Sequence, residues 1–447
     1  MKEYNRKSRY SYESKSVGLP FFFLVFYLLA VLIRPQDFVT SMFGMPLVMM
    51  ITVTCLLFTV ALHRPLVWLP PQTFLLMMLP VIAISAFLNG WGMNGLVESQ
   101  NILISSIVPL FLFVTLVNST YRQKIIMIIT ICSSLVMVHN GWTQFTSPDA
   151  FGWAGNQAVG GELRRIIYVG IFSDPNDLGM LLVMNIPFLM YFFYRGGGLT
   201  KLLCLCLFLI FSYGVYMTGS RGTLLGCTSL IGLYLLLKYG GGRLIIFSII
   251  VGPVVATLLS QFGGLNSGEA SARGRLYAWY DGIQYLIGNP LFGVGKGNFF
   301  DMHGLTAHNS YILVASELGT LGYTLWGGAL TFTVYIGYRI FKVSKSDAVN
   351  RFDKSDVENR EKLKDELLLN NALFFSMIGF LVTAFFLSRS YVLLLFIFIG
   401  LSLASHLRVI KMIPELKHLL SYSVLIKCGF ASWVMIFMVY FTLKFTL

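Results

Sequence analysis

Charged residues are scarce in this chain. Only 12% of its 447 residues are Asp, Glu, Lys or Arg, whereas 56% are hydrophobic. A soluble protein of this length would carry more charge and shorter apolar runs, so the composition excludes an ordinary soluble globular protein. Acidic residues are the rarer sign, with 20 against 33 basic ones.

Cysteines and nucleotide-binding motifs are also few or missing. The six cysteines lie within or beside apolar stretches and none falls in a polar loop, so no disulfide framework is expected. The sequence has no Walker loop, no dinucleotide fingerprint and no tandem repeat. These absences exclude nucleotide-driven chemistry of the common kinds and repeat architectures.

Long apolar runs dominate what is present. Runs of about 17–20 residues match the length that crosses roughly 30 Å of hydrocarbon. They occur at 17–33, 45–62, 70–88, 101–117, 123–143, 176–194, 200–217, 222–237, 244–260, 309–338, 368–387, 391–405 and 424–443. The pattern predicts an all-α polytopic membrane protein with twelve or thirteen spans. The first run follows a polar, basic head and is one of many, so we do not interpret it as a cleaved signal peptide.

These runs divide the chain into consecutive segments. We expect a basic cytoplasmic head (1–16), a five-helix membrane region (17–143), a first long outer loop (144–175), membrane helices six to nine (176–260), a second long outer loop (261–308), membrane helix ten (309–338), a charged cytoplasmic loop (339–367) and the C-terminal membrane helices (368–447).

The distribution of Lys and Arg predicts the orientation. With the head in the cytoplasm and each span changing sides, 24 of the 33 basic residues fall on the cytoplasmic side. The net charge of +13 is therefore mostly a topology signal and predicts no nucleic-acid partner. Seven of the nine outer basic residues are arginines, whose planar fork grips phosphate or carboxylate, so the outer face is expected to bind an anion. The alternative is that single outer arginines contact lipid headgroups.

The first outer loop ends in FSDPNDLGM, at 172–180. Asp174 fits a helix N-cap, Pro175 the first helical position, and Asp177 the third, where it complements exposed amides. A helix start at the membrane interface is sufficient to explain these residues, and a direct chemical role is the alternative.

The second outer loop contains an amphipathic pattern. Leu276, Trp279, Tyr280, Ile283 and Ile287 recur at helical spacing, and Gly288-Asn289-Pro290 ends the helix. Such a helix is expected to lie along the membrane interface. The glycines of the following LFGVGKGNF are interpreted as a tight return toward the tenth span.

Two arginines lie in very short outer turns. Arg221 stands in TGSRGT between the seventh and eighth spans, and Arg389 stands in LSRSY between the eleventh and twelfth. A charge held at this depth is costly and usually pairs or has a function.

His308 opens an apolar, helix-length stretch, AHNSYILVASELGTLG. The positive potential at a helix start disfavours imidazolium, and a neutral imidazole is a competent general base. The alternative is an interfacial histidine that caps the helix together with Asn309. Glu317 lies two and a half turns further on, so it is expected to pair within the bundle and not to orient His308.

Four motifs in this order resemble the O-antigen ligase and polymerase family of bacterial envelope enzymes. They are SDPNDLG (173–179), GSRGTLLG (219–226), ARGRLYAW with NPLFGVGKGNF (272–299) and AHNSYILVASELGTLG (307–322). The resemblance covers about 170–330, which is less than half of the chain.

The resemblance implies a C-type glycosyltransferase of the bacterial inner membrane that works on its periplasmic face without metal or cofactor. The donor would be a glycan on a polyprenyl diphosphate, the acceptor a hydroxyl, and a regulator of chain length a possible further partner. His308 would be the general base. Arg221 and either Arg273 or Arg275 would bind the diphosphate, as would Arg164 and Arg165, which no motif fixes. Residues expected to support the site are Asp174, Asn176, Asp177, Asn309, Glu317 and Arg389.

Several functions remain open from the sequence. The leading hypothesis is a polysaccharide polymerase, and the alternatives are an O-antigen ligase and a protein O-oligosaccharyltransferase. A transporter of lipid-linked glycans is the alternative without chemistry. Transporters favour internal repeats and ionisable residues at mid-membrane, whereas here the charges gather at the outer edge.

Overall fold

The computed structural model describes residues 18–160, 163–261, 265–345 and 357–446. The predicted head at 1–16 and the middle of the predicted loop at 339–367 lie outside these residues. In the described part, each predicted span is helical. The helices are α1 (Leu19–Leu32), α2 (Leu47–Leu62), α3 (Pro70–Leu88), α4 (Gly92–Ile102), α5 (Val108–Leu116), α6 (Thr120–Thr146), α7 (Pro175–Arg195), α8 (Gly198–Met217), α9 (Arg221–Tyr239), α10 (Gly241–Gln261), α11 (Leu265–Gly288), α12 (Asn298–His303), α13 (Ser310–Lys345), α14 (Val357–Phe386), α15 (Leu393–Met412) and α16 (Tyr422–Thr446).

The protein is an all-α polytopic membrane protein. Eleven stretches of helix among the described residues are long and apolar enough to cross a membrane. They correspond to eleven of the predicted spans, with α4 and α5 joined through a π-helical turn at Leu103–Ile107. The other two predicted spans are α2, which has only 16 residues, and α13. Helices suit this environment because they satisfy their backbone hydrogen bonds internally.

Helix α13 lies at the centre of the bundle, where it packs against α3, α14 and α16. It differs from the continuous span predicted at 309–338, because Gly319 has φ 64° and ψ −163° and interrupts the helix. Residues 290–295 lie against this break: the Val294 and Gly295 amides donate to the carbonyls of Ser316 and Glu317, both at 2.9 Å. The glycines at 293–297 therefore form more than a tight return, since their backbone replaces helical hydrogen bonds that α13 lacks.

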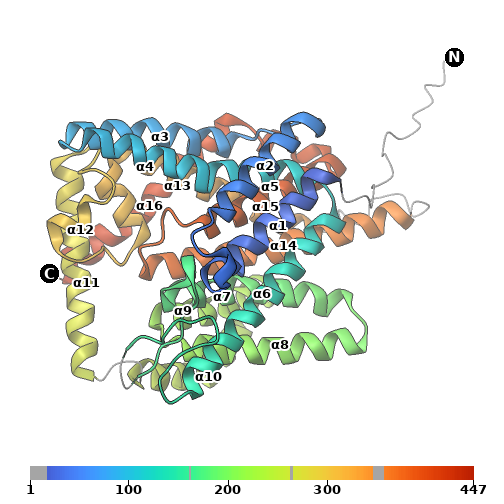
Figure 1. Cartoon of the computed structure of the whole chain (residues 1–447), viewed down its shortest axis with the longest axis horizontal. Coiled ribbons are helices and arrows are strands. Elements are labelled where there is room, and N and C mark those ends of the chain that lie inside the picture. Colours follow the sequence, from blue (N-terminus) through green and yellow to red (C-terminus); the bar gives the residue numbers. More distant parts are fainter. Residues whose placement is uncertain (1–17, 161–162, 262–264, 346–356, 447) are drawn as a thin grey trace.

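Helix α11 stands across the ends of the other helices, whereas α7, α8 and α14 run side by side (Figure 1). Its buried side differs in part from the predicted stripe. Trp279 and Ile283 are buried as expected, but Tyr280 and Ile287 are exposed. The contact with α13 explains which face of α11 is buried. A Cβ at Gly282 would approach Ile312 of α13 to 2.4 Å, so the buried face is centred on this glycine.

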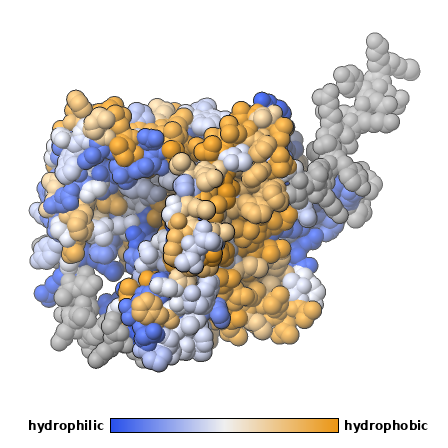
Figure 2. Space-filling model, viewed as in Figure 1, coloured by the Kyte–Doolittle hydropathy of each residue, from blue (hydrophilic) through white to orange (hydrophobic). Residues whose placement is uncertain are grey.

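The turns of the bundle gather at two ends. We term the end with α11 and α12, at the left of Figure 1, the site end, and the end with the α7–α8 turn, at the right, the opposite end. Contacts join segments far apart in sequence: the side-chain amide of Asn89 donates to the Gly293 carbonyl at 3.0 Å at the site end, and the rings of Phe38 and Trp153 lie 5.5 Å apart nearer the middle of the molecule. Figure 2 shows hydrophilic residues gathered around a hollow near α11 and α12, and a broad hydrophobic surface over the right-hand part.

Candidate active site at the site end

Three helices begin together at the site end. Asp174 caps α7 by accepting the Asn176 amide at 2.7 Å, as the sequence predicted, and Ser220 caps α9. The Ser220 hydroxyl also donates to Asn176 Oδ1 at 2.6 Å, which fixes the two helix starts against each other. Asn309 caps α13, with its Oδ1 accepting the Tyr311 amide at 2.9 Å. Helix starts expose amide groups and carry a partial positive charge, so their convergence favours an anion.

His308 immediately precedes the capping residue of α13. It adopts φ 49°, so the backbone turns sharply here. The alternative interpretation expected His308 and Asn309 to cap the helix together, but the cap hydrogen bonds are accepted by Asn309. The indole of Trp279 on α11 donates to the Ala307 carbonyl at 3.0 Å and holds this turn in place. The His308 side chain itself is half-buried.

The surroundings keep the imidazole neutral. Burial lowers the pKa of His308 below its ordinary value, and the positive charges of Arg275 and Arg389 lower it further, while Asp174 acts in the opposite direction. A neutral imidazole near pH 7 can accept a proton. The same interactions show that Arg275, Arg389 and Asp174 all lie close enough to act on this ring.

Arg389 is held by carboxylates at the start of α7. Its Nη2 lies 2.5 Å from Asp174 Oδ2, and its Nε lies 2.6 Å from Asp177 Oδ1. Its backbone amide donates to the Ser310 hydroxyl at 2.8 Å. Arg389 thus joins the α14–α15 turn to the starts of α7 and α13. Asp177 does more than complement exposed amides, because it is one of the two carboxylates that pair with Arg389.

Arg221 and Arg275 approach each other from different elements. Arg221 is the first residue of α9, and burial together with its positive charge lowers the pKa of Arg275 on α11. Among the described residues Arg275 forms no ion pair. Arg273 lies two residues away, which places it on the other side of the helix, and it is exposed.

The two adjacent arginines of the first outer loop, Arg164 and Arg165, also have different surroundings. Arg165 Nε donates to the Thr218 carbonyl at 2.9 Å, and its side chain lies over Gly219, where an added Cβ would approach it to 3.0 Å. Arg165 therefore lines the turn that carries Arg221. Arg164 instead donates to carbonyls at the end of α6, including Phe145 at 3.2 Å, which is a structural use of the guanidinium.

Glu317 lies within the bundle and away from His308. It is 3% exposed, and its carboxylate accepts the Gly297 amide at 2.9 Å and the Tyr391 hydroxyl at 3.3 Å. These contacts tie the glycine-rich loop to α13 and to the α14–α15 turn. The second histidine of the long loop, His303, pairs with Asp281 at 2.7 Å, an arrangement that links α12 to α11.

Some members of this cluster escape sequence reasoning. The tie between Ser220 and Asn176 and the ion pairs of Arg389 join residues 44 and 215 positions apart. A spacing rule reaches only a few positions along a helix, so no local pattern shows them. The glycine before Ser220 is a local signal of this packing. Gly219 has φ 57°, and because it has no Cβ it leaves room for the Arg165 side chain.

Comparison with known families identifies part of the chain. Residues 206–327, from within α8 to within α13, match the Wzy_C family model, which is described as O-antigen ligase. The match supports the resemblance seen in the motifs, and over this region the chain is similar to the O-antigen ligase family. A search of curated proteins gave no match. The matched region contains Arg221, Arg273, Arg275 and His308, whereas Arg165, Asp174 and Arg389 lie outside it.

Proposed function

We propose that this protein is a glycosyltransferase that polymerises polyprenyl-diphosphate-linked oligosaccharides. The observation that carries the proposal is the half-buried imidazole of His308, with its pKa lowered, beside Arg275 and the charge cluster at the start of α7. A neutral base and an anion site in one place suit the transfer of a sugar from a diphosphate to a hydroxyl.

In the proposed reaction, His308 removes the proton of the acceptor hydroxyl as its oxygen attacks the anomeric carbon of the donor. The bond from that carbon to the diphosphate oxygen breaks, and the diphosphate leaves with the electron pair. Arg221, Arg275 and Arg165, with the starts of α7 and α9, stabilise the developing negative charge. The proton then passes from His308 to solvent, which restores the base for another cycle.

Arg389 has a positioning role in this proposal. Its guanidinium is engaged by Asp174 and Asp177 at 2.5 and 2.6 Å, so we assign it no direct contact with the leaving diphosphate. It fixes the start of α13 relative to α7 through the Ser310 hydroxyl, and its charge helps to keep His308 neutral. Asp174, Asn176 and Asn309 likewise shape the site through helix caps.

We further propose that the site end faces the periplasm. The excess of Lys and Arg on the segments assigned to the other side supports this orientation. Reporter fusions at 150–160 and at 350–356 test it directly. The proposal expects the first to be periplasmic and the second cytoplasmic, and the reverse result would overturn the orientation.

A ligase that moves finished glycans to lipid A-core is the second candidate, favoured by the description of the matched family. Deletion of the gene, followed by analysis of surface glycans, distinguishes the two. A polymerase mutant retains single repeat units on core and loses long chains. A ligase mutant has bare core and accumulates long chains on the carrier lipid, a result that would refute polymerisation.

A further inference from the structure

A polar cavity lies at the site end, apart from the arginines. It has a volume of about 280 Å³, close to the lower end of small-molecule sites, which is roughly 300 Å³. The α3–α4 turn and the start of α4 form one wall, and the glycine-rich loop with α12 forms the other. Its polar and aromatic lining residues are Trp91, Asn94, Glu98, Lys296, Asn298 and Asp301.

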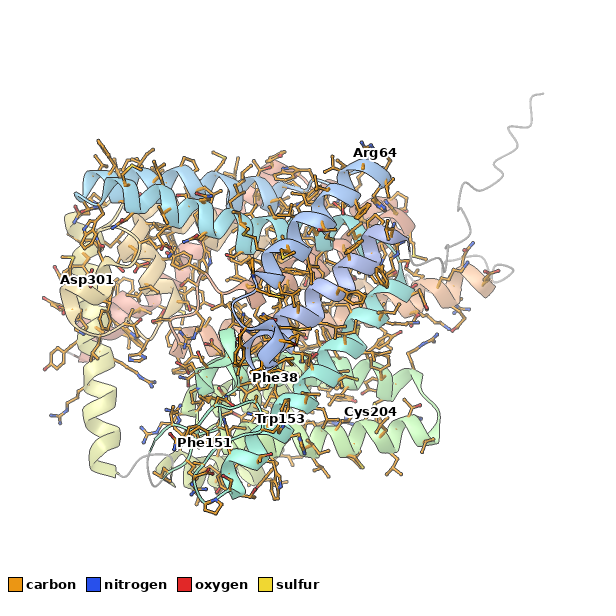
Figure 3. The ribbon with its side chains drawn as sticks, viewed as in Figure 1. Phe38, Arg64, Phe151, Trp153, Cys204 and Asp301 are labelled. Carbon is orange, nitrogen blue, oxygen red and sulfur yellow. The ribbon has the colours of Figure 1, made fainter. Side chains whose placement is uncertain are left out.

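The lining of this cavity includes one basic and two acidic side chains. Lys296 Nζ lies 2.5 Å from Glu98 Oε2, and the exposed carboxylate of Asp301 adds a further acidic group. Figure 3 shows Asp301 at the left edge of the molecule. With more acidic than basic groups, this cavity does not favour an anion, unlike the arginine cluster. Amide and carboxylate groups suit the donors and acceptors of a neutral, hydroxyl-rich ligand.

Trp91 supplies an aromatic surface beside these polar groups. The residue is 44% exposed, and its backbone carbonyl accepts the backbone amide of Asn94 at 2.9 Å, at the start of α4. An indole ring offers a large, rigid apolar face at little conformational cost, and the ring carbons of a sugar present a matching apolar face. An accessible indole among amide and carboxylate groups therefore fits a saccharide.

Side-chain contacts of the α14–α15 turn link the wall of the cavity to the candidate active site. Lys296 Nζ lies 5.2 Å from the ring centre of Tyr391, and the Tyr391 hydroxyl donates to Glu317. Tyr391 is two residues from Arg389, so their Cα atoms are separated by at most about 7 Å. Along α13, the seven positions from Ser310 to Glu317 correspond to about 10 Å. The cavity is thus within the reach of an oligosaccharide whose end lies at His308.

We propose that this cavity is a saccharide subsite that holds a sugar of the acceptor glycan, one or more residues away from the attacking hydroxyl. The inference rests on the proposed function and extends it to the acceptor. In the proposed function the arginines bind the diphosphate of the donor, whereas the neutral acceptor end of a glycan has no charged group for the protein to bind. Contacts with remote sugars can position such an acceptor and lower its KM without taking part in the chemistry.

The test separates donor from acceptor in a transfer assay with purified full-length protein. The donor is the natural lipid-diphosphate-linked repeat unit, and the acceptor is an alkyl glycoside of the same repeat unit, which has no leaving group and cannot act as a donor. We expect Trp91→Ala to raise the KM for the glycoside roughly tenfold, with kcat and the donor KM nearly unchanged. Trp91→Phe, which keeps an aromatic face, should recover most of the loss.

Trp142→Ala is the matched control, because Trp142 is similarly exposed, at 48%, but does not line the cavity. An unchanged acceptor KM in Trp91→Ala would overturn the inference, and so would a rise confined to the donor KM or an equal loss in Trp142→Ala. Saturation-transfer NMR with the glycoside gives a second readout, in which contact should be lost in Trp91→Ala. A wild-type protein that binds the glycoside without extending it would refute polymerisation and support the subsite, whereas one that does neither refutes both.

Discussion

The two polar ends of the bundle use charge differently. At the opposite end, acids and bases pair closely: Lys124 lies 2.7 Å from Asp365, and Arg408 lies 2.7 Å from Glu366. At the site end Arg389 is neutralised by Asp174 and Asp177, and Lys296 pairs with Glu98, whereas Arg275 forms no ion pair among the described residues. Paired charges fasten helices to one another, whereas an excess of one sign leaves capacity for a ligand.

The composition of the two ends agrees with this division. Arg408 is 8% exposed and bonds the Val117 carbonyl at 2.6 Å and Gln123 Oε1 at 3.3 Å, so it joins α15 to the residues around the start of α6. Its hydrogen-bonding groups are engaged within the protein. At the site end, the helix starts and arginines together create a positive region. We therefore expect substitutions at the opposite end to affect stability and those at the site end to affect transfer.

The largest expected effect is on the candidate base. His308→Ala should reduce transfer by about 10²- to 10⁴-fold while the protein remains folded, because the acceptor hydroxyl keeps its proton. His303→Ala is the control from the same loop, since His303 pairs with Asp281 and is expected to matter much less. Surface glycan length in a deletion strain carrying each variant at equal protein levels measures the difference. Long glycans in the His308→Ala strain would remove this residue from the mechanism.

At the opposite end, Arg408→Met should lower stability by about 3–5 kcal/mol, because it breaks a buried ion pair. The site end should keep its chemistry in the molecules that remain folded. Unfolding of purified protein in detergent, measured with kcat per folded molecule, checks both points. Arg64→Met is a control on an exposed arginine (Figure 3) and should change stability little. The comparison fails if Arg408→Met is as stable as the wild type.

Within the site end, Arg221 and Arg275 are expected to differ from Arg273. Loss of a charged contact to the diphosphate should cost about 2–4 kcal/mol at the transition state, so Arg221→Ala and Arg275→Ala should slow transfer strongly. Lys at position 221 should restore little, because it keeps the charge but lacks the planar fork. Arg273→Ala should stay near wild type, because that side chain is exposed. Single-turnover rates with saturating donor give the ranking, and a loss confined to Arg273→Ala would reverse our assignment.

The smallest expected effect is a shift in pH dependence. The pKa of His308 is lowered mainly by burial and next by Arg275, so its base form persists to a lower pH than in an ordinary histidine. Transfer should therefore fall on acidification only below the usual range of histidine. Arg275→Gln removes one lowering charge and should move this acid limb to higher pH. An unchanged or opposite shift in the residual activity would show that His308 is not the titrating base.

Local sequence patterns predicted the helix starts of the site well. The Asp174 cap and Pro175 at the first turn follow from residue preferences at helix ends, and the single turn around Arg221 follows from the length of its neighbouring spans. The family motifs also directed attention to His308. Each of these inferences depends on residues within a few positions of one another.

Tertiary contacts limited what the sequence could predict. The break of α13 at Gly319 depends on the backbone of Leu291 and Phe292, which a Cβ at Gly319 would approach to 2.5 and 2.6 Å. The sequence around Gly319 is a plausible continuous helix by itself, so the break could not be inferred locally. The choice between Arg273 and Arg275 likewise depended on which face of α11 packs against α13.

The central claim is that the site end binds the donor with arginines and removes the proton with His308. Its most direct test measures donor binding and transfer on the same purified preparation of His308→Gln, since glutamine keeps a hydrogen-bonding amide but accepts no proton near neutral pH. The account predicts donor affinity close to wild type and transfer reduced by at least about 100-fold. Wild-type turnover by His308→Gln would contradict it.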